Sequence, residues 1–105
     1  MSIVTKKFVF KRTGHIVRNR TVLAAMTNKQ SHENGILSNN EIKWLTRRAK
    51  GGFGIITTAA THVSLDGQGW EGEFGTFDDS HISGLSDLAN NLKQNGAIAI
   101  AQIFH

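Results

Sequence analysis

The stretch AIAIAQIFH, residues 97–105, decides how this chain is expected to fold. Its apolar residues predict a buried β-strand with Ile98, Ile100 and Gln102 on one face, because side chains alternate along a strand. The opposite face carries Ala97, Ala99 and Ala101, which are small enough to let helices pack closely. In parallel α/β proteins, ligands gather at the carboxyl ends of strands. We therefore expect the polar end of this strand to border a binding site.

The rest of the chain predicts strands and helices in alternation. Residues 8–10 and 15–17 flank Gly14 and read as a short hairpin. Further strands are expected over three stretches, namely residues 21–27, 53–60 and 97 onward. Helices are expected between these strands, over residues 38–50 and 80–94. Alternation of this kind predicts the α/β class, with a parallel sheet and right-handed crossovers.

The first helix carries signals at both ends. Ser38 and Glu41 fit a capping box, in which the serine caps the first turn and the glutamate side chain reaches back. Gly51-Gly52 follows the last helical residue and predicts the stop, because glycine tolerates the conformation that a helix end requires. The second helix is expected to bury one face, made of Ile82, Leu85, Ala89 and Leu92. Residues 61–79 are expected to form a long loop, and loops of that length are often functional.

Composition limits the class of protein. The 105 residues are 39% hydrophobic and 19% charged, which is typical of one globular domain. The chain has no cysteine, and Met1–Phe10 is basic and lacks the apolar core of a secretory signal. No apolar run is long enough to span a membrane. These features predict a cytoplasmic protein with no membrane partner.

Charge is unevenly distributed along the chain. Residues 1–50 contain eleven Lys and Arg against two Glu, whereas residues 51–105 contain one Lys against six acids. A basic half can indicate a nucleic-acid partner. The basic residues are scattered and not interleaved with aromatics, so we favour a solvated face and expect no nucleic-acid partner. Salt-dependent binding of DNA or RNA through residues 6–20 would support the alternative.

Two apparent motifs carry no function. The glycines of Gly51-Gly52-Phe53-Gly54 close a helix and open a strand, which is the reverse of a dinucleotide-binding loop. The five histidines show no metal-ligand spacing, so no metal site is expected. His62 and His105 lie at or just past strand ends, where ligand contact is possible. We interpret His62 as an ordinary hydrogen-bonded surface histidine.

The predicted strand ends are informative when taken together. Met26-Thr27, Ala60 and Gln102 lie at the ends of three strands, and parallel strands bring these positions to one edge of the sheet. The Gln102 amide offers both a donor and an acceptor. It suits a ligand edge that alternates in the same way, such as an amide or a pyrimidine-like ring. A glutamine bonded to neighbouring backbone explains the residue equally well, so both interpretations stay open.

Three stretches together resemble a known family. RNRTVLAAMT (residues 18–27) resembles the first barrel strand of the Old Yellow Enzyme family, the FMN-dependent NADH:flavin oxidoreductases and ene-reductases. RRAKGGFGII (residues 47–56) is similar to the junction between helix one and strand two of that family. GAIAIAQIFH (residues 96–105) is similar to its third strand. The order and spacing of all three agree, and the match covers nearly the whole chain.

The resemblance implies a fold and a cofactor. The family fold is a (β/α)8 TIM barrel, of which residues 1–105 would supply a short N-terminal β-hairpin and the first three βα units, as part of a single FMN-binding domain. The backbone around Ala25 and Met26 would lie against the flavin, and Thr27 would sit near flavin N5 and O4. Ala60 would offer a backbone contact near O4, and Gln102 would bond the pyrimidine edge.

The resemblance also implies an activity. The complete enzyme would take hydride from NADH or NADPH and deliver it through FMN to an activated alkene or a similar small-molecule acceptor. This sequence departs from the family where Ala25 replaces the usual proline and where Lys29 replaces an aromatic residue found in some members. The substrate-binding His pair, the proton-donor tyrosine and the flavin-binding arginines come from later strands, so no catalytic residue is expected within residues 1–105.

A second hypothesis belongs to a different class. The 105-residue chain alone would be a catalytically inactive barrel fragment, acting only as a structural or association module and possibly as a homo-oligomer. Three strands cannot close a barrel and would leave exposed sheet edges, which promote association. This hypothesis predicts weak FMN binding, or none, by the chain alone.

Overall fold

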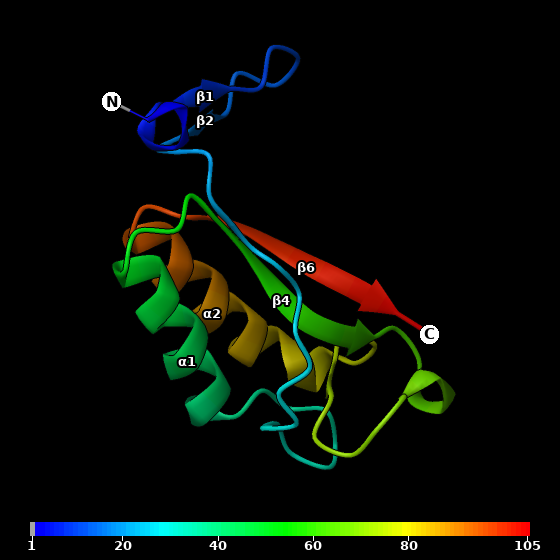
Figure 1. The fold of residues 1–105 in the computed structure, drawn as a ribbon. Coiled ribbons are helices and arrows are strands. Elements are labelled where there is room, and N and C mark those ends of the chain that lie inside the picture. The colour runs from blue at the N-terminus through cyan, green and yellow to red at the C-terminus, as the bar shows by residue number, and fades with distance from the viewer. Residues whose placement is uncertain (1) are drawn as a thin grey trace.

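The computed structural model describes residues 2–105 as a parallel sheet with two helices on one face and a separate hairpin (Figure 1). The strands are β1 (Phe8–Val9), β2 (Ile16–Val17), β3 (Val22–Leu23), β4 (Ile55–His62), β5 (Phe74–Gly75) and β6 (Ile98–Phe104). The helices are α1 (Asn39–Lys50) and α2 (Ile82–Gln94), with 3-10 turns η1 (Ile3–Thr5), η2 (Leu65–Gly67) and η3 (Asp79–His81). The α/β class and the hairpin predicted from the sequence are confirmed.

β4 is the central strand of the sheet. It pairs in parallel with β6 along one edge, where Ile55 lies opposite Ile98. Along its other edge β4 pairs first with β3, where Val22 lies opposite the same Ile55, and then with β5 at Thr61 and His62. Figure 1 shows β4 and β6 side by side, with α1 and α2 together on one side of them.

The hydrophobic core lies between the two helices and this face of the sheet. It contains Leu45 and Ala49 of α1, Ile56 of β4 and Leu92 of α2, all at most 1% exposed. The other face is open among residues 2–105, because Val22 and Ile100, which lie on it, are 54% and 45% exposed. The helices therefore cover only one face of the sheet.

Arg18 joins the ends of three elements. Its guanidinium donates to the carbonyl oxygens of Asn95 (2.7 Å), Ala49 (2.5 Å) and Phe53 (2.8 Å). The first two carbonyls lie at the C-terminal ends of α2 and α1, where helical carbonyls have no partner within the helix. The third precedes β4. One side chain thus aligns both helices with the start of the central strand.

The first helix begins as expected, but its glutamate behaves differently. The Ser38 hydroxyl accepts a hydrogen bond from the backbone N–H of Glu41, which confirms the serine cap. The prediction that the Glu41 side chain reaches back to the cap is wrong. That carboxylate is fully buried and accepts hydrogen bonds from the side chains of Asn28 (2.9 Å) and Ser31. It therefore fastens the loop that follows β3.

The first predicted barrel strand is shorter than expected. Only Val22–Leu23 pairs with β4, although residues 21–27 read as a strand. In this register residues 24–27 would lie opposite residues 57–60, but the pairing with β3 stops at Ile56, and β5 pairs with the same edge only at Thr61 and His62. The chain beyond Leu23 turns instead toward the N-terminal end of α1, where Glu41 holds it.

The second helix buries most of the predicted face but not its first residue. Leu88 and Leu92 are its buried residues, Leu85 packs against the core, and Ile82 is 57% exposed. The helix is preceded by the turn η3, so Ile82 falls in the first helical turn, outside the cover of the sheet. Leu88, which the sequence analysis left out, takes its place in the core.

Candidate functional site

The parallel ladder between β4 and β6 is irregular near its middle. Thr57 lies opposite Ile100 and Ala60 lies opposite Gln102, so β4 carries one extra residue between these pairs. The Thr58 hydroxyl accepts a hydrogen bond from the Gln102 backbone N–H (3.2 Å). It also donates to a carbonyl of its own strand. The Thr58 hydroxyl therefore pairs with the Gln102 N–H at the bulge, where the register between the two strands shifts by one residue.

Ala60 and Gln102, two of the predicted site residues, are brought together by this register. Their Cα atoms are partners in the parallel ladder. Ala60 is buried, whereas Gln102 is exposed. The Gln102 side-chain amide has no hydrogen-bond partner within residues 2–105, whereas its backbone N–H donates to the Thr58 hydroxyl. The amide is therefore free to meet a ligand with both its donor and its acceptor.

Ala25, Met26 and Thr27, the other predicted site residues, lie outside the strand ladder. They follow β3 and precede Asn28, which Glu41 holds. Ala25 is half-buried, Met26 is 45% exposed and Thr27 is exposed. All five predicted positions thus lie in or beyond the carboxyl-terminal parts of parallel strands. Only Ala60 and Gln102 are paired directly.

The loop after β3 packs against the loop between β4 and β5. The Ser31 N–H donates to the Gly72 carbonyl (2.9 Å). Gly72 has φ +85°, and a Cβ atom at this position would lie 2.5 Å from the carbonyl oxygen of Lys29. Lys29 itself has a positive φ of 52°. The two loops therefore touch backbone to backbone, which fixes where the segment after β3 can lie.

This contact gives a prediction. Gly72→Ala should lower the free energy of unfolding by about 3 kcal/mol, roughly 1 from the left-handed φ and roughly 2 from overpacking. Gly14→Ala is the matched control, because Gly14 has φ +75° with nothing within 4 Å of a Cβ atom. Urea unfolding of the two variants measures the difference. Equal losses would show that the close contact between the loops is unimportant.

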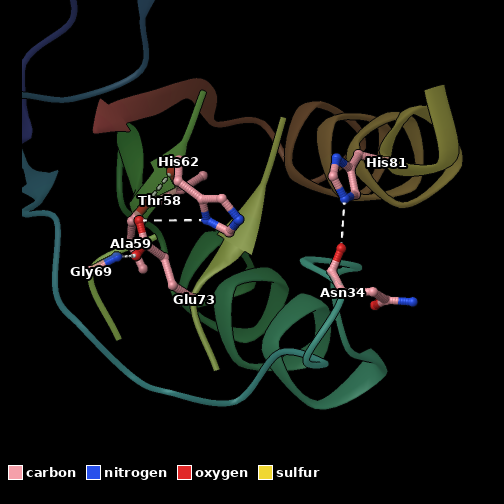
Figure 2. A network of polar contacts seen from close by, with 7 residues as sticks. All are labelled: Asn34, Thr58, Ala59, His62, Gly69, Glu73 and His81. Carbon is pink, nitrogen blue, oxygen red and sulfur yellow. Dashed lines mark hydrogen bonds and ion pairs between the residues drawn. The ribbon is translucent and has the colours of Figure 1, made fainter. Parts of the chain in front are cut away.

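His62 is not a surface residue, so its interpretation as one is wrong. It is the last residue of β4 and only 2% exposed, because β4 extends two residues past its predicted end and pairs there with β5. Its Nδ1 atom lies 3.7 Å from Oε1 of Glu73, which is also buried (Figure 2). The sequence analysis missed Glu73, since no local pattern distinguishes it from the exposed acids nearby.

A second histidine supports the same region from the other side. The Nε2 atom of His81 is 2.9 Å from the Asn34 carbonyl oxygen (Figure 2). Its ring packs edge-on against Phe77, which in turn contacts the His62 ring. Asp78 caps the turn η3, and hydrogen bonds from Ser80 lower the pKa of its carboxyl group. These contacts hold the start of α2 beside the end of β4.

Within residues 2–105, no three His, Asp or Glu side chains are placed to hold a metal ion. Across these residues, neither helix has the length and hydropathy needed to cross a membrane.

With this geometry established, comparison with known proteins identifies the class. Residues 10–105 match the NADH:flavin oxidoreductase / NADH oxidase family of FMN oxidoreductases, and the chain belongs to this family. The predicted resemblance to Old Yellow Enzyme is confirmed.

Individual relatives agree with this family. The chain is 38% identical over 98 residues to a probable NADH-dependent flavin oxidoreductase of Bacillus subtilis, YqiG, covering 93% of this chain and 26% of that protein. A solved 2-naphthoyl-CoA reductase, in complex with 2-naphthoyl-CoA, superposes with a TM-score of 0.90 at 36% identity, over 98% of this chain and 16% of that one. The Old Yellow Enzyme homologue of Zymomonas mobilis superposes with a TM-score of 0.88 at 20% identity, over 99% and 28%.

These relatives are longer than the 105 residues. The chain spans about a quarter of the Bacillus relative and less of the 2-naphthoyl-CoA reductase. The described α/β fold superposes on one part of each of the longer solved chains. The family implies FMN as cofactor and a nicotinamide as reductant.

The exposed polar groups at the strand ends fit FMN. The free Gln102 amide can pair with a ring edge that carries both donors and acceptors. The exposed Thr27 hydroxyl can donate to a ring heteroatom. Ala60 is buried, and its small side chain adds little bulk beside Gln102.

Proposed function

We propose that residues 1–105 form the first three βα units of a (β/α)8 barrel and supply one wall of its FMN site. In this assignment β3, β4 and β6 are barrel strands one to three, and the β1–β2 hairpin precedes them. The segment is then part of a single FMN-binding domain. The open sheet face, with Ile98, Ile100 and Val22, becomes the barrel lumen.

Five residues contact the cofactor in this proposal. The backbone at Ala25 and Met26 lies against the flavin, and the Thr27 hydroxyl sits near N5 and O4. The Ala60 backbone approaches O4, and the Gln102 amide bonds the pyrimidine edge. The supporting observation is the pairing of Ala60 with Gln102 beyond the bulge, which leaves the glutamine amide without a partner in residues 2–105.

The protein residues bind and orient, whereas the redox chemistry belongs to the cofactor. When bound, FMN supplies hydride transfer from NADH or NADPH to an acceptor. A hydroxyl at Thr27 that donates to the ring would favour its electron-rich state. We propose an activated alkene or a similar conjugated small molecule as acceptor. The 36% identical 2-naphthoyl-CoA reductase supports this class, because its substrate conjugates a ring to a thioester carbonyl.

Anaerobic flavin spectroscopy tests the proposed function. The full-length protein is purified with FMN, and NADH or NADPH is added without oxygen. We expect the oxidised flavin absorbance to bleach and then to recover when a cyclic enone is added. A protein that retains no FMN, or whose flavin neither nicotinamide reduces, would refute the proposal.

The 105-residue chain alone should behave differently. We expect it to retain little or no FMN, because the open sheet face leaves the ring uncovered and flavin-binding arginines from later strands are not part of the segment. The measurement is flavin fluorescence after gel filtration of the chain with added FMN. Stoichiometric retention with quenched fluorescence would contradict the prediction. Elution as an oligomer would instead support its alternative role as an association module.

Two other expectations rest on the sequence alone and stay predictions. These are the cytoplasmic location and the absence of nucleic-acid and membrane partners. A salt-sensitive shift of DNA or RNA in a retardation assay would contradict the second.

A further inference from the structure

A buried ionisable pair, His62 with Glu73, has no place in the proposed flavin contacts. Its side chains are 2% and 0% exposed. The 3.7 Å between Nδ1 and Oε1 is longer than a hydrogen bond, and neither atom has another hydrogen-bond partner in residues 2–105. Buried polar atoms are almost always hydrogen-bonded. The pair therefore requires an explanation beyond ordinary packing.

The two residues stand at the two ends of one loop. His62 ends β4, and Glu73 immediately precedes β5, so residues 63–72 form a strap between them. The second carboxylate oxygen of Glu73 accepts a hydrogen bond from the Gly69 N–H inside the strap (2.7 Å). Figure 2 shows Glu73 between His62 and Gly69. The Glu73 carboxylate therefore contacts both Gly69, in the middle of the strap, and His62, the last residue of β4.

The strap lies across the end of β6. The Val63 N–H donates to the Phe104 carbonyl (3.2 Å), and the Trp70 ring packs against the Phe104 ring with centroids 5.3 Å apart. A Cβ atom at Gly69 would lie 2.8 Å from the Phe104 ring and 3.4 Å from the Glu73 carboxylate. The strap is therefore in close contact with β6 two residues beyond Gln102.

We propose that His62 and Glu73 are positioning residues. They form a latch that holds the strap on β6 and so fixes the Ala60–Gln102 edge for the flavin. Attraction between a carboxylate and an imidazole N–H within a buried site favours the closed strap. Removing one partner leaves the other buried and uncompensated, which is the costly way to break such a pair. The inference that the closed strap fixes the Ala60–Gln102 edge for the flavin rests on the proposed function.

Hydrogen exchange tests the latch without any cofactor. Glu73→Gln keeps the shape of the side chain and an acceptor for Gly69, but removes the charge beside His62. In the full-length protein, we expect amides of residues 63–70 to exchange about tenfold faster than in the wild type. Glu71→Gln is the matched control, because Glu71 is an exposed acid of the same strap. Unchanged exchange in α1 would show that the variant stays folded.

A second pair of variants separates coupling from simple damage. His62→Gln should open the strap as Glu73→Gln does, and the double variant should exchange no faster than either single one, because both remove the same interaction. Equal exchange in Glu73→Gln and Glu71→Gln would overturn the latch. The latch would also be overturned if the increases in exchange caused by Glu73→Gln and His62→Gln add up in the double variant.

The flavin measurement tests the positioning step. FMN binding to Glu73→Gln should weaken about tenfold, and the visible spectrum of the bound flavin should shift, whereas Glu71→Gln should match the wild type. A strap that opens without any change in FMN affinity or spectrum would overturn positioning and leave the proposed function intact. If the wild type itself binds no FMN, the proposed function fails, and the exchange measurement alone decides the latch.

Discussion

Arg18→Met should lower the free energy of unfolding by about 4 kcal/mol, the largest effect expected in this chain. The methionine keeps most of the apolar stem but removes three hydrogen bonds to the carbonyls of Ala49, Phe53 and Asn95. Those carbonyls lie in a partly buried region, so each loses a charged donor that water replaces only in part. The measurement is urea unfolding followed by circular dichroism.

Two comparisons make the Arg18 result specific. Arg20→Met removes an exposed arginine two residues away, whose side chain makes a long hydrogen bond to the Lys7 carbonyl (3.5 Å) and lies over the Phe8 ring, and should cost less than about 1 kcal/mol. Arg18→Lys should recover only part of the loss, because an ammonium cannot reproduce the planar fork of donors. Equal effects of the Arg18 and Arg20 substitutions would show that the three carbonyl contacts contribute nothing.

Glu41→Ala is the second large effect, with an expected loss of about 3 kcal/mol. The Glu41 carboxylate is fully buried and accepts from Asn28 and Ser31, so its removal leaves two donors unpaired and a cavity behind. The loss should be concentrated in the loop after β3, which includes the proposed flavin contacts. Hydrogen exchange over residues 24–37 measures it directly.

The loop itself offers a matched control for this variant. Glu33→Ala removes an exposed carboxylate of the same loop and should change neither stability nor exchange by a measurable amount. Ser31→Ala, which removes only one of the two donors, should give an intermediate effect. If Glu33→Ala and Glu41→Ala loosen the loop equally, net charge rather than the buried contact controls it.

Local signals predicted the elements that depend on neighbouring residues. The Ser38 cap, the glycine stop after α1 and the strand near the end of the chain were readable, because the residues that determine them lie within a few positions of one another. The burial predicted for that strand is wrong within residues 2–105, because none of the residues Ile98–Phe104 is buried. The edge formed by Ala60 and Gln102 was also anticipated, since parallel strands in a βα repeat end on the same side.

Features decided by distant contacts were not readable. Arg18 bonds a carbonyl 77 positions away, and Glu41 turns from its own cap to Asn28, 13 positions earlier. His62 was taken for a surface residue because its burial depends on β5. These long-range contacts depend on which loops lie next to each other in the fold, and a single sequence does not show that.

The central claim is that Gln102 presents its amide to FMN. The most direct test is the FMN dissociation constant of the full-length protein with Gln102→Ala, compared with Gln94→Ala, an exposed glutamine of α2 on the far side of the core. We predict that affinity falls at least about tenfold for Gln102→Ala and is unchanged for Gln94→Ala. Equal affinities in the two variants would contradict the claim.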